Sequence, residues 1–222
     1  MSEVTVTVRG EHEARIAPER ATIRVSVRAE GSERAVVVDR VMQLAQPVRE
    51  SITARRETGI VVDWTSKQLA VRAERPWNNE GKRLDPVYYA SVDLTATFAE
   101  ASELSLWVTD ISPWEGVEVG WVDWHLTSET TQRIEREVAA AAVGVAVARA
   151  QAYATALGLA TVTPVEIADA GLIAPAATQP FAGMAKARGA MLQQSDAGGP
   201  SMEYEPDEIV ISTTVEARFL AR

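Results

Sequence analysis

Strict alternation of apolar and polar residues is the feature that most limits what this chain can fold into. It occurs in four segments, at residues 4–8, 22–28, 88–98 and 209–219. Successive side chains of a β-strand point to opposite faces, so each segment is expected to form a strand with one apolar and one polar face. Strands of this kind build antiparallel sheets with one face on a core and the other in solvent.

Two further segments, residues 60–73 and 117–126, alternate in the same way but change phase midway. A slip of one residue is what a β-bulge produces, because two residues then oppose one on the neighbouring strand. The sequence therefore predicts bulges near Ser66 to Gln68 and near Trp121.

Three segments have apolar residues three and four positions apart, which is typical of amphipathic helices. The first follows Gly31 and contains Pro47, which is expected to kink it. A short helix is expected near Ser102, and a long one from about Ser128 to Leu157. The small residues on the long helix should let it approach its sheet closely. Its predicted inner stripe is Ile134, Val138, Ala141, Val145, Ala148 and Ala152.

Together these segments predict an α+β fold, in which an antiparallel sheet carries two long helices and one short helix on one face. Ala, Gly, Pro, Ser and Gln dominate residues 170–206, which show no sustained periodicity. So long an unpatterned connection is uncommon within a compact domain. Because a clear strand follows, we expect a single domain over residues 1–222 with a long irregular loop insertion at about 170–206.

Composition excludes several classes of function. The net charge is −9, and no segment concentrates the Lys and Arg residues that neutralise phosphates. The basic spot from Lys186 to Arg188 is too small to change this, so we expect no nucleic-acid partner. The chain has no cysteine, which excludes disulfides, thiolate metal sites and a cysteine nucleophile.

The first residues, Met1 to Glu3, lead directly into a strand pattern with no basic start and no long apolar stretch. A run of about 18 apolar residues, as a membrane span requires, is also missing from the sequence. The expectation is a cytoplasmic protein without a membrane span.

Catalytic candidates are few. His12 and His125 are the only histidines, and they are too far apart in sequence for ordinary zinc-ligand spacing. His12 is expected in the turn of a first hairpin, and His125 at the end of a strand. The sequence has no phosphate-binding glycine loop and no nucleophile elbow. We therefore expect no catalytic residues, no metal, no cofactor and no enzymatic activity. A hydrolase stays open only if His125 is buried beside a carboxylate and a serine.

Tryptophan is the exception, with six residues, four of them between Trp107 and Trp124. Most are expected to pack between helices and sheet, where each aromatic side chain buries about 150–250 Å². Trp121 and Trp124 fall on opposite sides of the predicted bulge, which would leave one of them on the outer face. An exposed tryptophan there is a candidate hot spot for a partner.

The order of these elements, together with four short segments, resembles the bacterial SIMPL domain family. Val6–Glu11 followed by Pro18–Thr22 resembles the first hairpin of that family, in which a glycine ends strand one and a proline precedes strand two. The other matching segments are Tyr89–Ser91, the alanine-rich Ala146–Gly158 and Pro206–Ile209. The resemblance implies an oligomeric protein linked to stress or the envelope, with no catalytic residues to carry over. Relatives are mostly periplasmic or exported.

These observations favour a noncatalytic, self-associating interaction or scaffold protein whose partner is itself, as a homo-oligomer. The alternative is a small-molecule or peptide binding module. Its pocket would lie between the helix containing Pro47 and the bulged strands, and would be lined by Trp64, Trp121 or Trp124.

Overall fold

The computed structural model describes residues 3–173 and 205–222, and within them the chain forms eight strands and three helices. These elements divide into two compact units, each with its own antiparallel sheet and hydrophobic core. The α+β class expected from the sequence is therefore confirmed.

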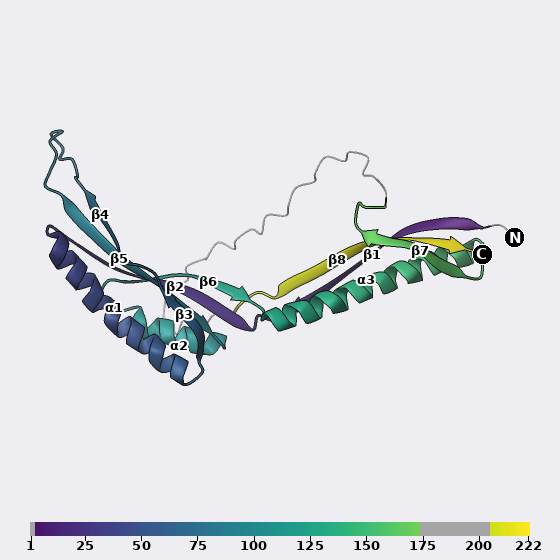
Figure 1. The fold of residues 1–222 in the computed structure, drawn as a ribbon, viewed down its shortest axis with the longest axis horizontal. Coiled ribbons are helices and arrows are strands. Elements are labelled where there is room, and N and C mark those ends of the chain that lie inside the picture. Colours follow the sequence, from purple (N-terminus) through teal and green to yellow (C-terminus); the bar gives the residue numbers. More distant parts are fainter. Residues whose placement is uncertain (1–2, 174–204) are drawn as a thin grey trace, which may run out of the picture. The chain divides into compact units, whose positions relative to one another are not determined.

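One unit contains a three-stranded sheet in the order β1-β8-β7, with one helix, α3, packed along it (Figure 1). The central strand β8 pairs with β1 over the full length of both, from Val4 opposite Ala221 to Ile16 opposite Ile209. The elements of this unit are β1 (Val4–Ile16), α3 (Ser128–Ala156), β7 (Val162–Asp169) and β8 (Ile209–Ala221).

Helix α3 approaches this sheet so closely that only the smallest side chains fit between them. At Gly10 in β1, an added Cβ would lie 2.0 Å from the carbonyl oxygen of Ala142. The buried residues of the helix recur every fourth position: Thr130, Ile134, Val138, Ala142, Ala146, Ala150 and Ala154. The predicted stripe is thus correct at its first two positions. It then departs by one residue or more, because the buried positions continue at every fourth residue and place Ala142 and Ala146 against Gly10.

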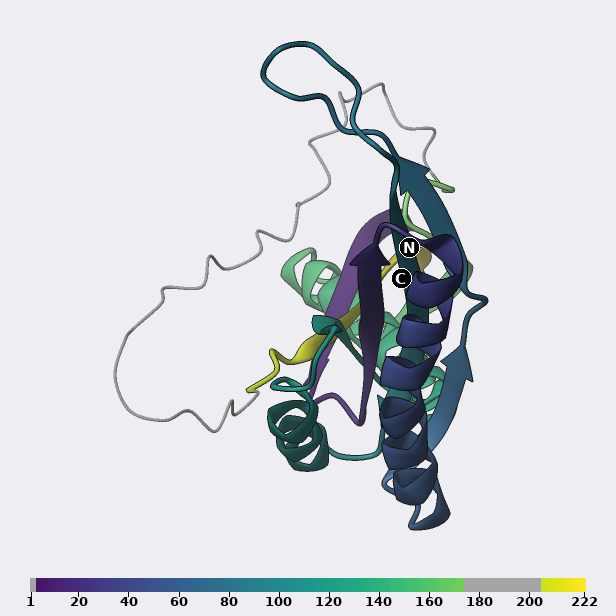
Figure 2. The ribbon, with the colours of Figure 1, turned by 90° about the vertical axis from the view of Figure 1, so that its left-hand side faces the viewer.

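The other unit contains a five-stranded sheet in the order β3-β5-β2-β6, with β4 also paired to β5. Helix α1 runs along its strands, as Figure 2 shows, and continues without interruption through Pro47. The elements of this unit are β2 (Arg20–Gly31), α1 (Arg34–Glu57), β3 (Val61–Ser66), β4 (Ala70–Glu74), β5 (Val87–Phe98), α2 (Ala101–Ile111) and β6 (Val117–His125).

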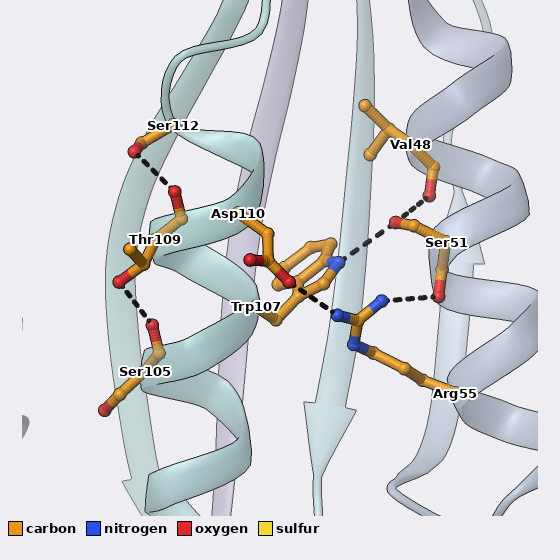
Figure 3. A network of polar contacts seen from close by, with 8 residues as sticks. All are labelled: Val48, Ser51, Arg55, Ser105, Trp107, Thr109, Asp110 and Ser112. Carbon is orange, nitrogen blue, oxygen red and sulfur yellow. Dashed lines mark hydrogen bonds and ion pairs between the residues drawn. The ribbon is translucent and has the colours of Figure 1, made fainter. Parts of the chain in front are cut away.

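The core of the five-stranded unit lies between the apolar face of its sheet and both helices, α1 and α2. Trp107 of α2 is fully buried and packs against Phe98, with ring centroids 5.2 Å apart. Its Nε1–H donates a 3.0 Å hydrogen bond to the Ser51 hydroxyl of α1, and Arg55 forms a 3.0 Å ion pair with Asp110 nearby (Figure 3). The two helices are therefore joined by a satisfied polar contact as well as by apolar packing.

The structure differs from the expected single sheet, because the chain passes from one sheet to the other between β1 and β2 and returns between β6 and β7. Strand β1 pairs with β8, whereas β2 pairs with β5 and β6. No first hairpin forms, and Gly10 lies inside β1 rather than at its end. The physical reason is that alternation determines which face of a strand is buried and carries no information about the neighbouring strand.

The packing within each unit does not decide the domain count, so one domain over residues 1–222 stays a prediction. Most of the predicted loop at 170–206 lies outside the described residues, as does the basic spot at Lys186 to Arg188.

Replacing Gly10 with alanine is expected to destabilise the three-stranded unit by about 1–3 kcal/mol, because the new methyl group would overpack the backbone of α3. Urea unfolding followed by circular dichroism measures this change. Gly144→Ala is the matched control. It lies in α3 with open space around its added Cβ, so the substitution should stabilise the helix by about 0.5–1 kcal/mol. Equal effects of the two variants would contradict the close contact.

Candidate interaction surface

All six tryptophans lie in the five-stranded unit, and their exposure separates them into core residues and surface residues. Trp107 is fully buried. Three others, Trp64, Trp114 and Trp124, are half-buried against the core. Trp77 and Trp121 are exposed, at 61% and 63%. The expectation that most tryptophans pack in the core is met, and these two residues are the exceptions.

Trp121 owes its exposure to a bulge in β6. Ile23 of β2 is opposite Val122, whereas Val25 is opposite Val119, so two steps along β2 correspond to three along β6. The extra residue lets Val119 and Val122 both pack against the core. Trp121 is turned to the outer face, while Trp124 points inward. The predicted bulge near Trp121 is confirmed, with one aromatic residue on each side of the strand.

Gly120 makes this bulge possible. An added Cβ at this position would lie 2.9 Å from the carbonyl oxygen of Arg24 on the neighbouring strand. The bulged segment can therefore approach β2 only without a side chain, and the next residue, Trp121, is directed away from the core. Bulges often re-aim a side chain at the edge of a sheet in this way.

The second predicted bulge, near Ser66 to Gln68, falls where one strand ends and the next begins, since residues 67–69 belong to no strand. The register shift within β3 lies between Val61 and Asp63 instead. Ser66 is opposite Leu94 and Ala70 is opposite Ser91, so four steps on one side correspond to three on β5. The extra residue divides the segment into β3 and β4.

Strand β6 lies at the edge of the five-stranded sheet. It pairs with β2 on one side, and within the described residues no strand pairs with its other side. The backbone groups along that edge can accept a further strand. An exposed tryptophan beside an open edge is a surface to which a protein partner could bind.

Within the part of the chain that the structure describes, neither histidine contacts a serine side chain. His12 lies within β1, opposite Thr213, and is exposed, so its expected place in a hairpin turn is wrong. The side chain of His125 is 38% exposed, and its Nδ1 lies 4.0 Å from the Asp123 carboxylate. His125 is thus not the buried histidine that the hydrolase hypothesis required.

Residues 3–173 and 205–222 hold no group of three or more side chains that could bind a metal ion. By length and composition helix α3 could cross a membrane, as could the core helix of many soluble proteins. Its alanine stripe packs against the three-stranded sheet, and the expectation of no membrane span stays a prediction.

Two of the hollows on the described residues lie on the five-stranded unit, and no tryptophan lines either of these two. One lies at the start of α1, around Gly31 and Val36, with a volume of about 260 Å³. The larger, of about 530 Å³, lies on the sheet and includes Arg28, Arg72 and Tyr89. The Trp-lined pocket of the alternative prediction does not coincide with these hollows.

One carboxyl group on the described residues is distinctly perturbed. Glu216 of β8 is buried and forms a 2.9 Å ion pair with Arg9 of β1. The pKa of Glu216 is lowered, mainly by the hydrogen bond from the Arg9 side chain and further by hydrogen bonds from the backbone N–H groups of Gly171 and Ile173. Desolvation of the buried carboxyl group acts in the opposite direction and raises the pKa. Perturbed groups mark functional sites in some proteins, but here the pairing joins two adjacent strands.

The fold and the open β6 edge define an α+β protein with two sheets and an exposed aromatic residue at a sheet edge. The profile of the SIMPL family, described as proteins of unknown function (DUF541), matches residues 6–219, and the chain belongs to this family. No curated protein matches the chain in sequence.

Replacing Glu216 with glutamine should destabilise the three-stranded unit at neutral pH and have less effect in acid. Because folding lowers the pKa of Glu216 from its ordinary value of 4.5, its ionised form stabilises the fold above that pH. This contribution is lost as the pH falls through the lowered pKa. Urea unfolding of both proteins over this pH range measures the change.

Glu137→Gln, in the exposed pair with Arg133, should have little effect throughout. A wild-type advantage over Glu216→Gln that grows in acid would contradict this account.

Proposed function

We propose that this chain is a noncatalytic protein that associates with further copies of itself and acts as an interaction scaffold. The observation that carries the proposal is Trp121, which is 63% exposed beside an open strand edge. A role in stress or envelope physiology is part of the proposal and rests on the family resemblance alone.

The physical argument begins with the energy of apolar burial. Covering an aromatic side chain removes about 150–250 Å² from water, at about 25 cal/mol per Å². Because Trp121 is 63% exposed, covering its exposed part gives a gross gain of about 2–4 kcal/mol for each copy, before the entropic cost of association. A two-fold contact would bury this residue on both copies, since the same surface occurs on each.

The edge of β6 supplies the second part of the argument. A second chain can add backbone hydrogen bonds along an open edge, and the bulge at Gly120 and Trp121 limits where regular pairing can occur. The side chain of Trp121 would therefore determine how the copies align, while the backbone on the flanks would add affinity.

A second candidate function, small-molecule binding, is favoured by one observation, the hollow of about 530 Å³ on the same sheet. It is independent of Trp121, because that residue does not line it.

Wild-type protein at tens of micromolar should have a mass above that of one chain in size-exclusion chromatography with light scattering. Trp121→Ala should shift it toward the monomer, because truncation of a hot-spot residue costs about 2 kcal/mol or more, or about thirtyfold in Kd.

Trp77→Ala is the matched control, since Trp77 is exposed to nearly the same degree and lies in the hairpin between β4 and β5, away from the β6 edge. It should leave the mass unchanged. A strictly monomeric wild type would defeat the proposal of self-association, and equal shifts from both variants would defeat the assignment to Trp121.

A further inference from the structure

The outer, helix-free face of the five-stranded sheet carries polar side chains that bind one another across the strands. The Thr22 and Thr97 hydroxyls lie 2.8 Å apart, and Ser26 donates a 2.7 Å hydrogen bond to Asp93. The Thr65 hydroxyl also pairs across the sheet, with Thr95 of β5. Along this part of the face, the hydroxyl groups are satisfied within the protein.

This pairing stops toward the end of the sheet where β4 replaces β3 as the neighbour of β5. Ser91 of β5 lies between Arg28 and Ala70, and Tyr89 lies between Glu30 and Arg72. Within the described residues, neither the Ser91 hydroxyl nor the Tyr89 hydroxyl forms a hydrogen bond with the protein. Two polar groups are thus left for water or a ligand in one small area.

The same residues create a hollow of about 530 Å³. Its lining combines the short side chains of Ser91 and Ala70 with the long side chains of Arg28, Arg72 and Tyr89. Its volume is within the range of about 300–1,000 Å³ that is usual for small-molecule sites.

Both arginine head groups at the hollow contact neighbouring side chains. Arg28 forms a 2.7 Å ion pair with Glu118. Arg72 lies over the Tyr89 ring, with its guanidinium carbon 4.9 Å from the centroid, and its Nε forms a 3.1 Å ion pair with Glu74. Positioned guanidinium groups bind carboxylates in a fork geometry.

The lining also carries carboxylates. Glu30 and Glu118 balance the charges of Arg28 and Arg72, so the formal charge of the hollow is zero. Within the described residues Glu30 has no ion-pair partner. Arg28 and Glu30 belong to β2 and Arg72 to β4, with β5 between them. Positive and negative groups around one hollow match a ligand that bears both charges, and a simple anion or cation would meet repulsion from one of them.

We propose that this hollow binds a small zwitterion with a carboxylate and an ammonium group, as in a free amino acid or short peptide. Arg72, Arg28 and the Ser91 hydroxyl receive the carboxylate. Glu30 receives the ammonium group, and Tyr89 contacts the side chain. This site is separate from the Trp121 surface and does not depend on self-association.

Isothermal titration of the full chain with the standard amino acids and the dipeptide Gly-Phe tests the proposal. At least one should bind saturably. Its N-acetylated and C-amidated forms, which each lack one charge, should bind at least tenfold more weakly. No saturation by any of these up to tens of millimolar overturns the proposal, and so does binding that survives either block unchanged.

Variants then place the site. Arg72→Gln should weaken binding at least tenfold, and Ser91→Ala should weaken it severalfold while leaving thermal unfolding unchanged. The matched control is Arg133→Gln, which removes an arginine from an exposed ion pair on α3 and should leave binding unchanged. Tyr89→Phe keeps the ring beneath Arg72 and removes only the hydroxyl. If Arg133→Gln and Arg72→Gln weaken binding equally, the ligand binds elsewhere.

Discussion

One-sided burial is the constraint on which the rest of the structure depends. Each sheet has one apolar face, and its helices cover that face only: α3 covers the three-stranded sheet, and α1 and α2 cover the five-stranded sheet. A strand that is buried on one side must present its alternate residues to solvent on the other. The outer faces are therefore built from hydroxyl and charged side chains. On the five-stranded sheet, the outer face is also where both candidate functional features lie.

The two features arise from different departures from regular pairing. At β6, one extra residue beside Gly120 turns Trp121 outward while the valines on either side stay on the core. At β4, the strand pairing remains regular and the outer side chains change size, so that Ser91 and Ala70 leave a hollow between longer neighbours. The first feature is an exposed apolar side chain, which suits a protein partner. The second is concave and charged, which suits a small polar ligand.

The sequence was sufficient for features encoded by neighbouring residues. Alternation at 22–28 and 88–98 identified the buried faces of β2 and β5, and the phase slip at 117–126 located the bulge in β6 because it requires only a few consecutive residues. Strand partners were not predictable in the same way. Arg9 and Glu216 are 207 positions apart and meet only because β1 pairs with β8. The hollow needs the registers of β2, β4 and β5 together, so no local pattern indicates it. The phase of α3 was misjudged because the preference for alanine at 142 and 146 is set by Gly10 on a distant strand.

Gly10 and Gly120 show how the same physical device serves packing in one unit and presentation in the other. In both places a glycine lets two backbones approach more closely than a Cβ would permit. A Cβ added at Gly10 would lie 2.0 Å from the carbonyl oxygen of Ala142, and one added at Gly120 would lie 2.9 Å from the carbonyl oxygen of Arg24. At Gly10 the close approach brings a helix onto the sheet and buries it. At Gly120 the close approach lets β6 contain one residue more than the facing segment of β2, and Trp121 is directed to the surface. A surface aromatic residue held by such a constraint has a fixed direction, which lowers the entropic cost of using it for recognition.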